Sequence, residues 1–164
     1  MKVSVFTSSR PRHLALLKKL TRSGCDLSAV VEVVTAFPGV RQGFFRQSTV
    51  MKRYFCEVER AQRSYFGNLE FLPRMGRFMA IQMGDLNKLE ERDLKNLLNA
   101  ELFIVFGASI IKGWLIQELL RRATVNIHIG LSPFYRGSSC NFWALADGNP
   151  EYVGATVHFL TEGL

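Results

Sequence analysis

The sequence predicts an α/β fold in which helices cover both faces of a doubly wound, mostly parallel sheet. Short β-rich segments alternate with amphipathic helical segments along the chain. The run 27–34 is rich in β-branched residues, as is typical of a strand buried on both faces of a parallel sheet. Strands that alternate with helices favour parallel pairing through crossover connections. The predicted architecture is Rossmann-like, and ligands bind such sheets beyond the carboxyl ends of the strands.

The first 35 residues are predicted to form a strand, a helix and a second strand. The β-rich run 2–6 leads into three hydroxyl residues, and Pro11 suits the first turn of a helix. Leucines then recur at helical spacing, and Gly24 ends the helix. Further strands are expected at 77–83, 102–106, 124–129 and 155–160, with further helices at 88–98, 110–120 and 141–146.

The segment 36–77 differs from the rest of the chain in charge. Aromatic and apolar positions at helical spacing over 48–66 predict a basic helical excursion within the domain. The excess of basic over acidic residues in this segment is explained either by a solvated helix face or by a surface that binds phosphates. Eight basic residues (Arg41, Arg46, Lys52, Arg53, Arg60, Arg63, Arg74 and Arg77) stand against three acidic ones (Glu57, Glu59 and Glu70).

The composition is that of one globular domain. The 164 residues are 48% hydrophobic and 12% aromatic, enough for a substantial core. No run of about 18 apolar residues occurs, and the chain turns polar too early for a signal peptide, so we expect a cytoplasmic protein without membrane association. The net charge of +7 favours anionic ligands.

Cysteine and histidine spacing argues against a metal site. The three cysteines and three histidines form none of the short ligand pairs that structural zinc sites use. We therefore expect no metal, and reduced, buried thiols at Cys25, Cys56 and Cys140.

The chemistry is predicted to lie at Asn126 and His128, near the end of an expected strand. Residues two apart on a strand point to the same face, so an amide and an imidazole would share one small volume. In acyl transfer to an amine, the carbonyl oxygen gathers negative charge and needs a donor, while the attacking nitrogen must lose a proton. The Asn-x-His pattern alone is weak, because a histidine at a sheet edge more often bonds a loop carbonyl.

The surrounding motifs strengthen this interpretation. Asn126-Ile-His128 runs directly into Gly-Leu-Ser-Pro-Phe-Tyr-Arg-Gly, and a later segment reads Gly154-Ala-Thr-Val-His158-Phe-Leu-Thr-Glu-Gly-Leu164. Together they resemble the folate-dependent formyltransferase family, which includes glycinamide ribonucleotide, methionyl-tRNA and amino-sugar formyltransferases. The resemblance is strong over 102–164 and only topological before that. It implies the formyltransferase fold, 10-formyltetrahydrofolate as the formyl donor and a primary amine as the acceptor.

The resemblance also implies roles for individual residues. Asn126 would polarise the formyl oxygen, and His128 would handle protons. The family often has a cis proline bond at the position of Ser132-Pro133. Cofactor contacts would come from Phe106, Gly107, Ile110, Ile111, Leu131, Pro133, Thr161 and Glu162, and substrate contacts from Thr7, Ser8, Ser9, Arg10 and Arg136. Strand-to-helix packing at 106–111, helix capping by Ser9 and turn capping by Arg136 explain the same residues without a ligand.

The family's third catalytic residue is an Asp that would directly follow Leu164. We expect residues 1–164 to be a catalytic domain cut just before that carboxylate, and therefore nearly inactive in this form. Glu162 is the nearest acid, but its place in the motif is that of a loop residue.

The acceptor is less well defined, because the segment 6–11 matches neither the phosphate cradle of glycinamide ribonucleotide enzymes nor the first turn of the transfer-RNA enzymes. Three hypotheses stay open. The first is a formyltransferase that acts on a small amine such as an amino sugar. The second is a methionyl-tRNA enzyme that uses the basic 36–77 segment, and the third is a 10-formyltetrahydrofolate hydrolase or an inactive folate-binding relative. The sequence does not indicate an oligomeric state.

Overall fold

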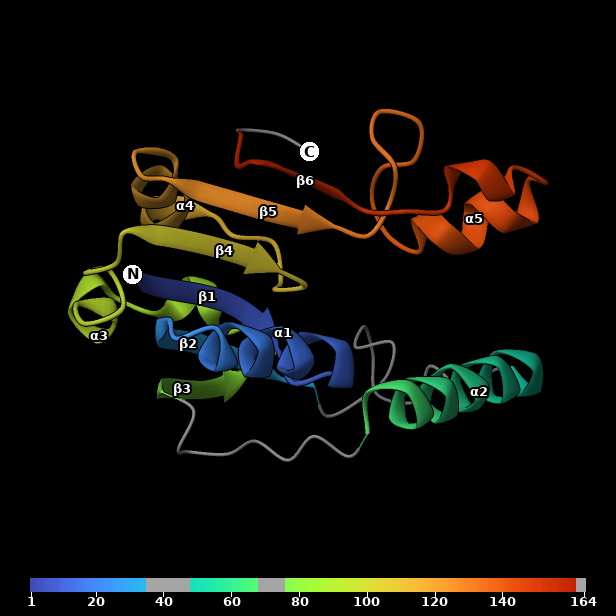
Figure 1. Ribbon diagram of the computed structural model, residues 1–164, viewed down its shortest axis with the longest axis horizontal. Coiled ribbons are helices and arrows are strands. Elements are labelled where there is room, and N and C mark those ends of the chain that lie inside the picture. The colour runs from blue at the N-terminus through green and yellow to red at the C-terminus, as the bar shows by residue number, and fades with distance from the viewer. Residues whose placement is uncertain (35–47, 68–75, 162–164) are drawn as a thin grey trace.

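The fold is a six-stranded sheet with helices on both faces, seen in a computed structural model that describes residues 1–34, 48–67 and 76–161 (Figure 1). The spatial order is β3-β2-β1-β4-β5-β6. Strands β1 to β5 pair in parallel, and β6 pairs antiparallel with β5. The predicted doubly wound, mostly parallel sheet is confirmed. The strands are β1 (Lys2–Ser8), β2 (Asp26–Val33), β3 (Arg77–Gln82), β4 (Leu102–Phe106), β5 (Thr124–His128) and β6 (Thr156–Phe159).

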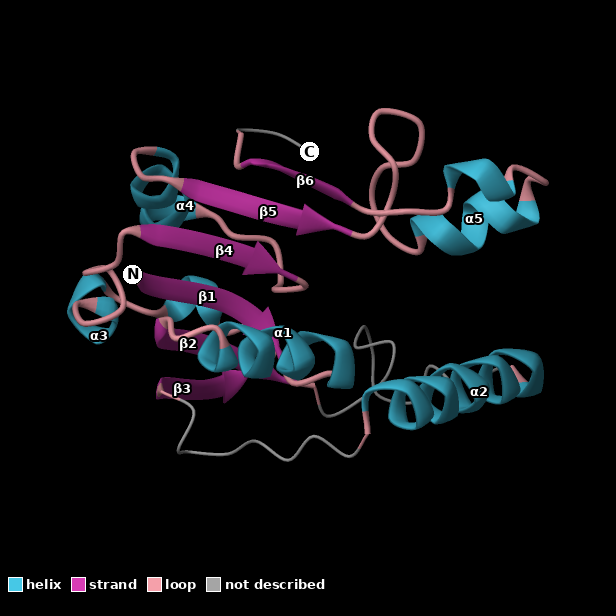
Figure 2. Ribbon diagram, viewed as in Figure 1, coloured by secondary structure: helices cyan, strands magenta, loops and turns pink. Residues whose placement is uncertain are grey.

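Helices connect these strands as expected (Figure 2). Helix α1 begins at Pro11 and ends at Arg22. Gly24, two residues past its end, has a positive φ of 79°, a conformation that commonly terminates helices. None of the described helices has the length and apolar character needed to cross a membrane. The helices are α1 (Pro11–Arg22), α2 (Thr49–Phe66), α3 (Glu91–Leu94), α4 (Gly113–Leu120) and α5 (Cys140–Ala146), with 3-10 turns η3 (Leu86–Lys88) and η4 (Pro150–Tyr152).

The core is double, because both faces of the sheet are covered. On one face, α1 packs Leu14 and Leu17 against Val3 and Val5 of β1. On the other face, Phe6 of the same strand joins side chains from η3, α3 and α4. Each fully buried large apolar side chain contributes about 1.5–3 kcal/mol to the free energy of unfolding. Strand β1 has apolar contacts on both sides and therefore holds the two layers together.

Two predicted helices differ from what is observed. Within the continuous helix expected over 88–98, only the four-residue α3 forms, and Leu97 and Leu98 are buried in the core from the turns that follow it. The helix expected from Ile110 begins only at Gly113. Residues 107–112 instead form a loop at the carboxyl end of β4.

Helix α2 is the described part of the basic excursion, and it extends beyond the carboxyl ends of the strands (Figure 1). It begins at a Ser48 cap, whose hydroxyl accepts from the Met51 amide, and it has no buried residue. Arg60 pairs with Glu57, and Arg63 pairs with Glu59. The remainder of the excursion, 36–47 and 68–75, lies outside the described residues.

A buried histidine closes the junction of α1 with β1 and β4. His13 is 2% exposed, its Nδ1 lies 2.5 Å from Ser8 Oγ, and its ring stands edge-on to Phe106. Arg12 Nε donates to His13 Nε2, so the Nδ1 nitrogen carries the hydrogen and donates to Ser8. Burial, followed by the charges of Arg12 and Arg10, lowers the pKa of His13 from 6.5 to about 3.

This lowered pKa predicts a loss of stability in acid. The unfolded chain takes up a proton at His13 below pH 6.5, whereas the folded chain does so only near pH 3. The contribution of His13 to the free energy of unfolding therefore has its full value above pH 6.5. As the pH falls below 6.5, the free energy of unfolding decreases by up to about 1.4 kcal/mol per pH unit. Urea unfolding of wild type and His13→Gln from pH 7 to 4 measures this slope, which the variant should lose. A His158→Gln control should keep it, and equal slopes in wild type and His13→Gln would contradict the assignment.

Candidate active site

The loops that follow β1, β4 and β5 meet at one edge of the sheet, because parallel strands end on the same side (Figure 1). Asn126 and His128 lie there on β5, two residues apart and therefore on the same face. In the register of the sheet, Val105 of β4 lies beside Asn126. Val105 belongs to the core under α3 and α4, so the two polar residues share that face.

Asn126 is held by a histidine on the neighbouring strand. His158 of β6 is its register partner, and Asn126 Nδ2 lies 3.2 Å from His158 Nε2. The Asn126 amide donates, because His158 Nδ1 carries the hydrogen that goes to the Phe159 carbonyl, 2.8 Å away. Asn126 is 9% exposed, so this bond fixes an almost buried amide. Residue-by-residue reasoning missed His158, although its place opposite Asn126 follows once β6 is known to run antiparallel.

His128 is held by the loop that follows its own strand. Its Nε2 lies 3.1 Å from the Tyr135 carbonyl oxygen and 3.5 Å from Cys140 Sγ. A carbonyl can only accept, so Nε2 donates and the lone pair of a neutral ring is on Nδ1. Burial raises the pKa of the Cys140 thiol, which makes this cysteine a packing neighbour and not a thiolate.

Two further residues shape the turn beneath His128. Thr156 of β6 is the register partner of His128, and its hydroxyl donates to the Gly130 carbonyl and accepts from the Ser132 amide. A Cβ on Gly130 would lie 2.6 Å from both the Cys140 Cβ and His128 Nε2, so only glycine fits. The Ser132-Pro133 bond that follows is cis. Thus β6 bonds directly to Asn126 through His158, and it supports the turn that follows His128 through Thr156.

The predicted cofactor contacts are distributed around the loop 107–112. Gly107 has a φ of 67°, and a Cβ there would meet the His13 ring at 2.3 Å. Ile110 is 76% exposed, whereas Ile111 packs against the core. The Phe106 side chain faces the α1 core, on the opposite side of the sheet from Asn126. Leu131 is half-buried, Pro133 and Thr161 are exposed, and Glu162 lies outside the described residues.

The predicted substrate contacts fall into two groups. The hydroxyls of Thr7 and Ser8 are buried and occupied, since Thr7 donates to the Phe106 carbonyl and Ser8 pairs with His13. Ser9 does not cap α1, because its hydroxyl accepts from the Val34 amide. Arg10 is half-buried at the start of α1, and Arg136 is exposed.

Positive charge gathers where α1 begins. Burial, then the neighbouring Arg12, lowers the pKa of Arg10 to about 10, and Glu59 of α2 opposes this change. Burial likewise lowers the pKa of Arg12. Both groups stay protonated at neutral pH, so the start of α1 is positively charged.

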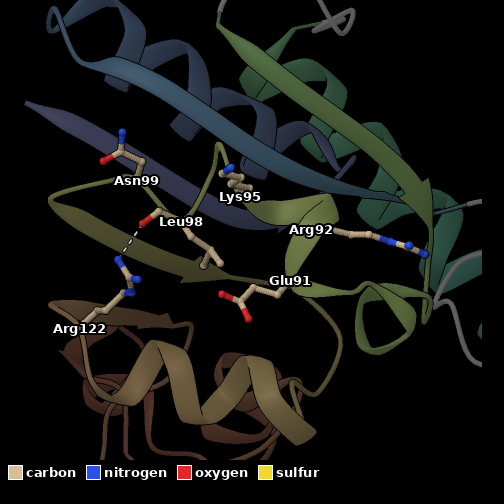
Figure 3. A pocket seen from close by; sticks show the side chains of 6 residues that line it. All are labelled: Glu91, Arg92, Lys95, Leu98, Asn99 and Arg122. Carbon is tan, nitrogen blue, oxygen red and sulfur yellow. Dashed lines mark hydrogen bonds between the residues drawn. The ribbon is translucent and has the colours of Figure 1, made fainter.

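A pocket of about 630 Å³ lies at the opposite edge of the sheet, where β4 and β5 begin (Figure 3). Arg122 is already engaged there, since it donates to the Leu98 carbonyl and pairs with Glu118. Figure 3 shows Arg92 pointing away from the other lining side chains. This pocket is remote from Asn126 and His128. Its lining residues are Glu91, Arg92, Lys95, Leu98, Asn99 and Arg122.

The described residues include neither a cluster of metal ligands nor a disulfide. Within the ranges 1–34, 48–67 and 76–161, no group of three or more His, Cys, Asp or Glu side chains is placed to hold a metal ion. The three cysteines are free, as expected, but the expectation that all are buried is wrong, because Cys56 is exposed on α2 and Cys25 is half-buried.

Three relatives show what this chain is similar to. Methionyl-tRNA formyltransferase of Desulforamulus reducens is 34% identical over 67 residues, which are 41% of this chain and 21% of that protein. Phosphoribosylglycinamide formyltransferase of Anaplasma phagocytophilum superposes with a TM-score of 0.61 at 16% identity, over 100% of this chain and 66% of that one. A formyltetrahydrofolate deformylase of Pseudomonas syringae superposes with a TM-score of 0.56 at 17% identity, over 99% of this chain and 47% of that one.

The two structural likenesses confirm the fold, and the chain spans about two thirds or less of the length of these relatives. The family itself is shown by sequence, because the model of the formyl transferase family matches residues 1–164, the whole of this chain. This chain is a member of the formyl transferase family.

Proposed function

We propose that this chain is the catalytic part of an enzyme that transfers the formyl group of 10-formyltetrahydrofolate to a primary amine on a small metabolite, such as an amino sugar. The observation that supports this proposal most is the pairing at the end of β5. There an amide and an imidazole lie on one face, each held by a separate partner. Acyl transfer needs these two groups side by side.

Asn126 is proposed to stabilise the oxyanion. Its amide nitrogen has two hydrogens, and one is donated to His158. The second hydrogen is proposed to meet the formyl oxygen as negative charge develops there. Because the His158 bond fixes the amide plane beforehand, little reorganisation is needed during the reaction.

His128 is proposed to move the proton. With Nε2 donating to Tyr135, the ring accepts at Nδ1 the proton that the amine loses as its nitrogen bonds to the formyl carbon. The same proton then passes to the departing folate nitrogen as the original carbon–nitrogen bond breaks. His128 thus returns to its starting state, and no oxidant or metal is needed.

The loop 107–112 is proposed to hold the folate. A flat heteroaromatic ring needs an open apolar surface, and Ile110 supplies one at the carboxyl edge. Gly107 exposes backbone beside it. Ile111, Leu131, Pro133, Thr161 and Glu162 are the further proposed contacts, while Phe106 would contribute only backbone.

The acceptor side is proposed to use Ser9, Arg10 and Arg136, with Thr7 and Ser8 as supports beneath them. A small anionic amine suits the positive charge where α1 begins. Transfer RNA is the second candidate, because α2 is basic and exposed. Two of its arginines are already paired with glutamates, which favours the small acceptor. A hydrolase, in which water replaces the amine, is the third candidate.

The predicted catalytic roles are tested by Asn126→Ala and His128→Ala in the full gene product that carries this chain. Each should lower kcat by about 10²-fold or more, since oxyanion donors and proton-transfer groups contribute that much. Folate affinity, measured by calorimetry with a stable analogue, should change little. Asn99→Ala, at the opposite edge of the sheet, is the control and should behave as wild type. Unchanged kcat in either variant removes that residue from the mechanism.

The folate wall is tested by Ile110→Ala. This variant removes carbon groups that the bound ring would bury, at about 0.8 kcal/mol each, so the affinity for a folate analogue should fall by about tenfold or more. The melting temperature should stay unchanged, because the side chain is 76% exposed. Val50→Ala on α2 removes an equally exposed side chain and is the matched control. Equal affinities of both variants for folate would place the cofactor elsewhere.

The acceptor is tested by turnover of 10-formyltetrahydrofolate with amino sugars, glycinamide ribonucleotide and methionyl-tRNA in separate assays. We expect turnover that depends on a small amine and varies little with salt. Turnover only with methionyl-tRNA, falling steeply with salt, would favour the second candidate. Folate turnover without any amine would favour the hydrolase.

A further inference from the structure

A buried carboxylate connects the loops of the proposed folate site. Glu32 is the penultimate residue of β2, at the carboxyl edge, and its exposed fraction is 0%. Its Oε1 accepts from the Gly84 amide at 2.8 Å and from the Ser109 hydroxyl at 2.6 Å. Its Oε2 accepts from the Ser109 amide at 2.6 Å. All three donors are loop groups, and none of the ion pairs among the described residues involves Glu32.

These bonds span the sheet from one strand to another that is not its neighbour. Gly84 follows β3, which lies beside β2, whereas Ser109 follows β4, which is separated from β2 by β1. The Glu32 carbonyl also accepts from the Ser9 amide, after β1. One residue therefore ties together the loops that follow three different strands.

The loop 107–112 has a second anchor further along. Asn87 of η3 donates to the Ile110 carbonyl and accepts from the Lys112 amide, both at 2.7 Å. Glu32 holds the start of this loop and Asn87 holds its end. Ile110 lies between them with its backbone fixed and its side chain exposed.

A carboxylate in this place is a costly way to gain stability. Burying an ionised group without a countercharge costs several kcal/mol, which hydrogen bonds only partly offset. Well-packed apolar side chains in the same place often stabilise a core equally or better. The carboxylate does supply several acceptor sites in a fixed geometry. Such bonds to backbone donors fix the path of a loop.

The geometry points to Glu32 as a positioning residue for formyl transfer, which sets the loop 107–112 in the conformation that binds the formyl donor. This inference rests on the proposed function, because it assumes that the loop meets folate. Glu32 itself does not touch the reacting atoms. Its substitution should act on donor binding and leave acceptor binding unchanged.

The test compares Glu32→Gln and Ser109→Ala with Ser4→Ala in the full gene product. Ser4 is the matched control, since its buried hydroxyl donates to the Leu97 carbonyl at the opposite edge of the sheet. Glu32→Gln should raise the KM for the formyl donor about tenfold or more, because a hydrogen bond to a charged acceptor is lost. Ser109→Ala should raise it less. In both, the KM for the amine should stay near wild type, and Ser4→Ala should lower only the melting temperature.

Amide hydrogen exchange gives a readout independent of activity. The Ser109 amide should be protected in wild type and in Ser4→Ala, and should exchange faster in Glu32→Gln. Donor KM values equal to wild type in Glu32→Gln and Ser109→Ala, with the same loss of melting temperature as Ser4→Ala, would reduce Glu32 to a structural residue and overturn the inference. If Glu32→Gln does not fold, the KM of Ser109→Ala for the formyl donor alone decides whether Glu32 is a positioning residue. Wild type that binds no folate analogue would instead defeat the proposed function, whereas unchanged Ser109 exchange in Glu32→Gln defeats the positioning role by itself.

Discussion

Burial of strand β1 on both faces is the constraint on which the rest of this structure depends. Val3 and Val5 face the α1 layer, and Phe6 faces the layer of η3, α3 and α4. Parallel neighbours on both sides of β1 then end at the same edge. The edge gathers loops from distant parts of the sequence because the strands beneath it cannot shift register without exposing one of the two cores.

Polar groups at this edge are treated in two ways. Some are buried and fully bonded: Ser8 pairs with His13, Thr7 donates to a backbone carbonyl, and Glu32 accepts from loop donors, and these bonds maintain the shape of the loops. Others have a further group that can form a hydrogen bond after their supporting bond is made: the second Nδ2 hydrogen of Asn126 and the Nδ1 nitrogen of His128. The first set makes the edge rigid, and the catalytic roles proposed for Asn126 and His128 depend on that rigidity, because a preorganised site needs its donors fixed in place.

Much of this could be predicted from sequence, and the exceptions have physical reasons. Hydrophobic periodicity was sufficient to locate the strands along the sequence and to predict α1, and spacing by two was sufficient to put Asn126 and His128 on one face. Periodicity failed over 88–98, where leucines at helical spacing are buried from short turns. It could not reveal Glu32, because a single acidic residue in a β-branched run carries no sign of three loop donors that lie 52 and 77 residues further along the chain. The commoner explanation of His128, a bond to a loop carbonyl, is also present, and it is compatible with the proposed proton-handling role because it fixes the tautomer.

Gly130 sets a limit on which substitutions the candidate active site can accept. Its missing side chain leaves the space that His128 and Cys140 fill, with 2.6 Å between a hypothetical Cβ and each of them. Any larger residue would displace the His128 imidazole or the Cys140 side chain. Under the proposed function, substitutions along β5 and its turn would therefore offer little scope for changing the acceptor, and exposed side chains around this edge of the sheet would offer more. Under the proposed function, the residues that perform the chemistry and those that select the acceptor would therefore lie at separate places in the fold.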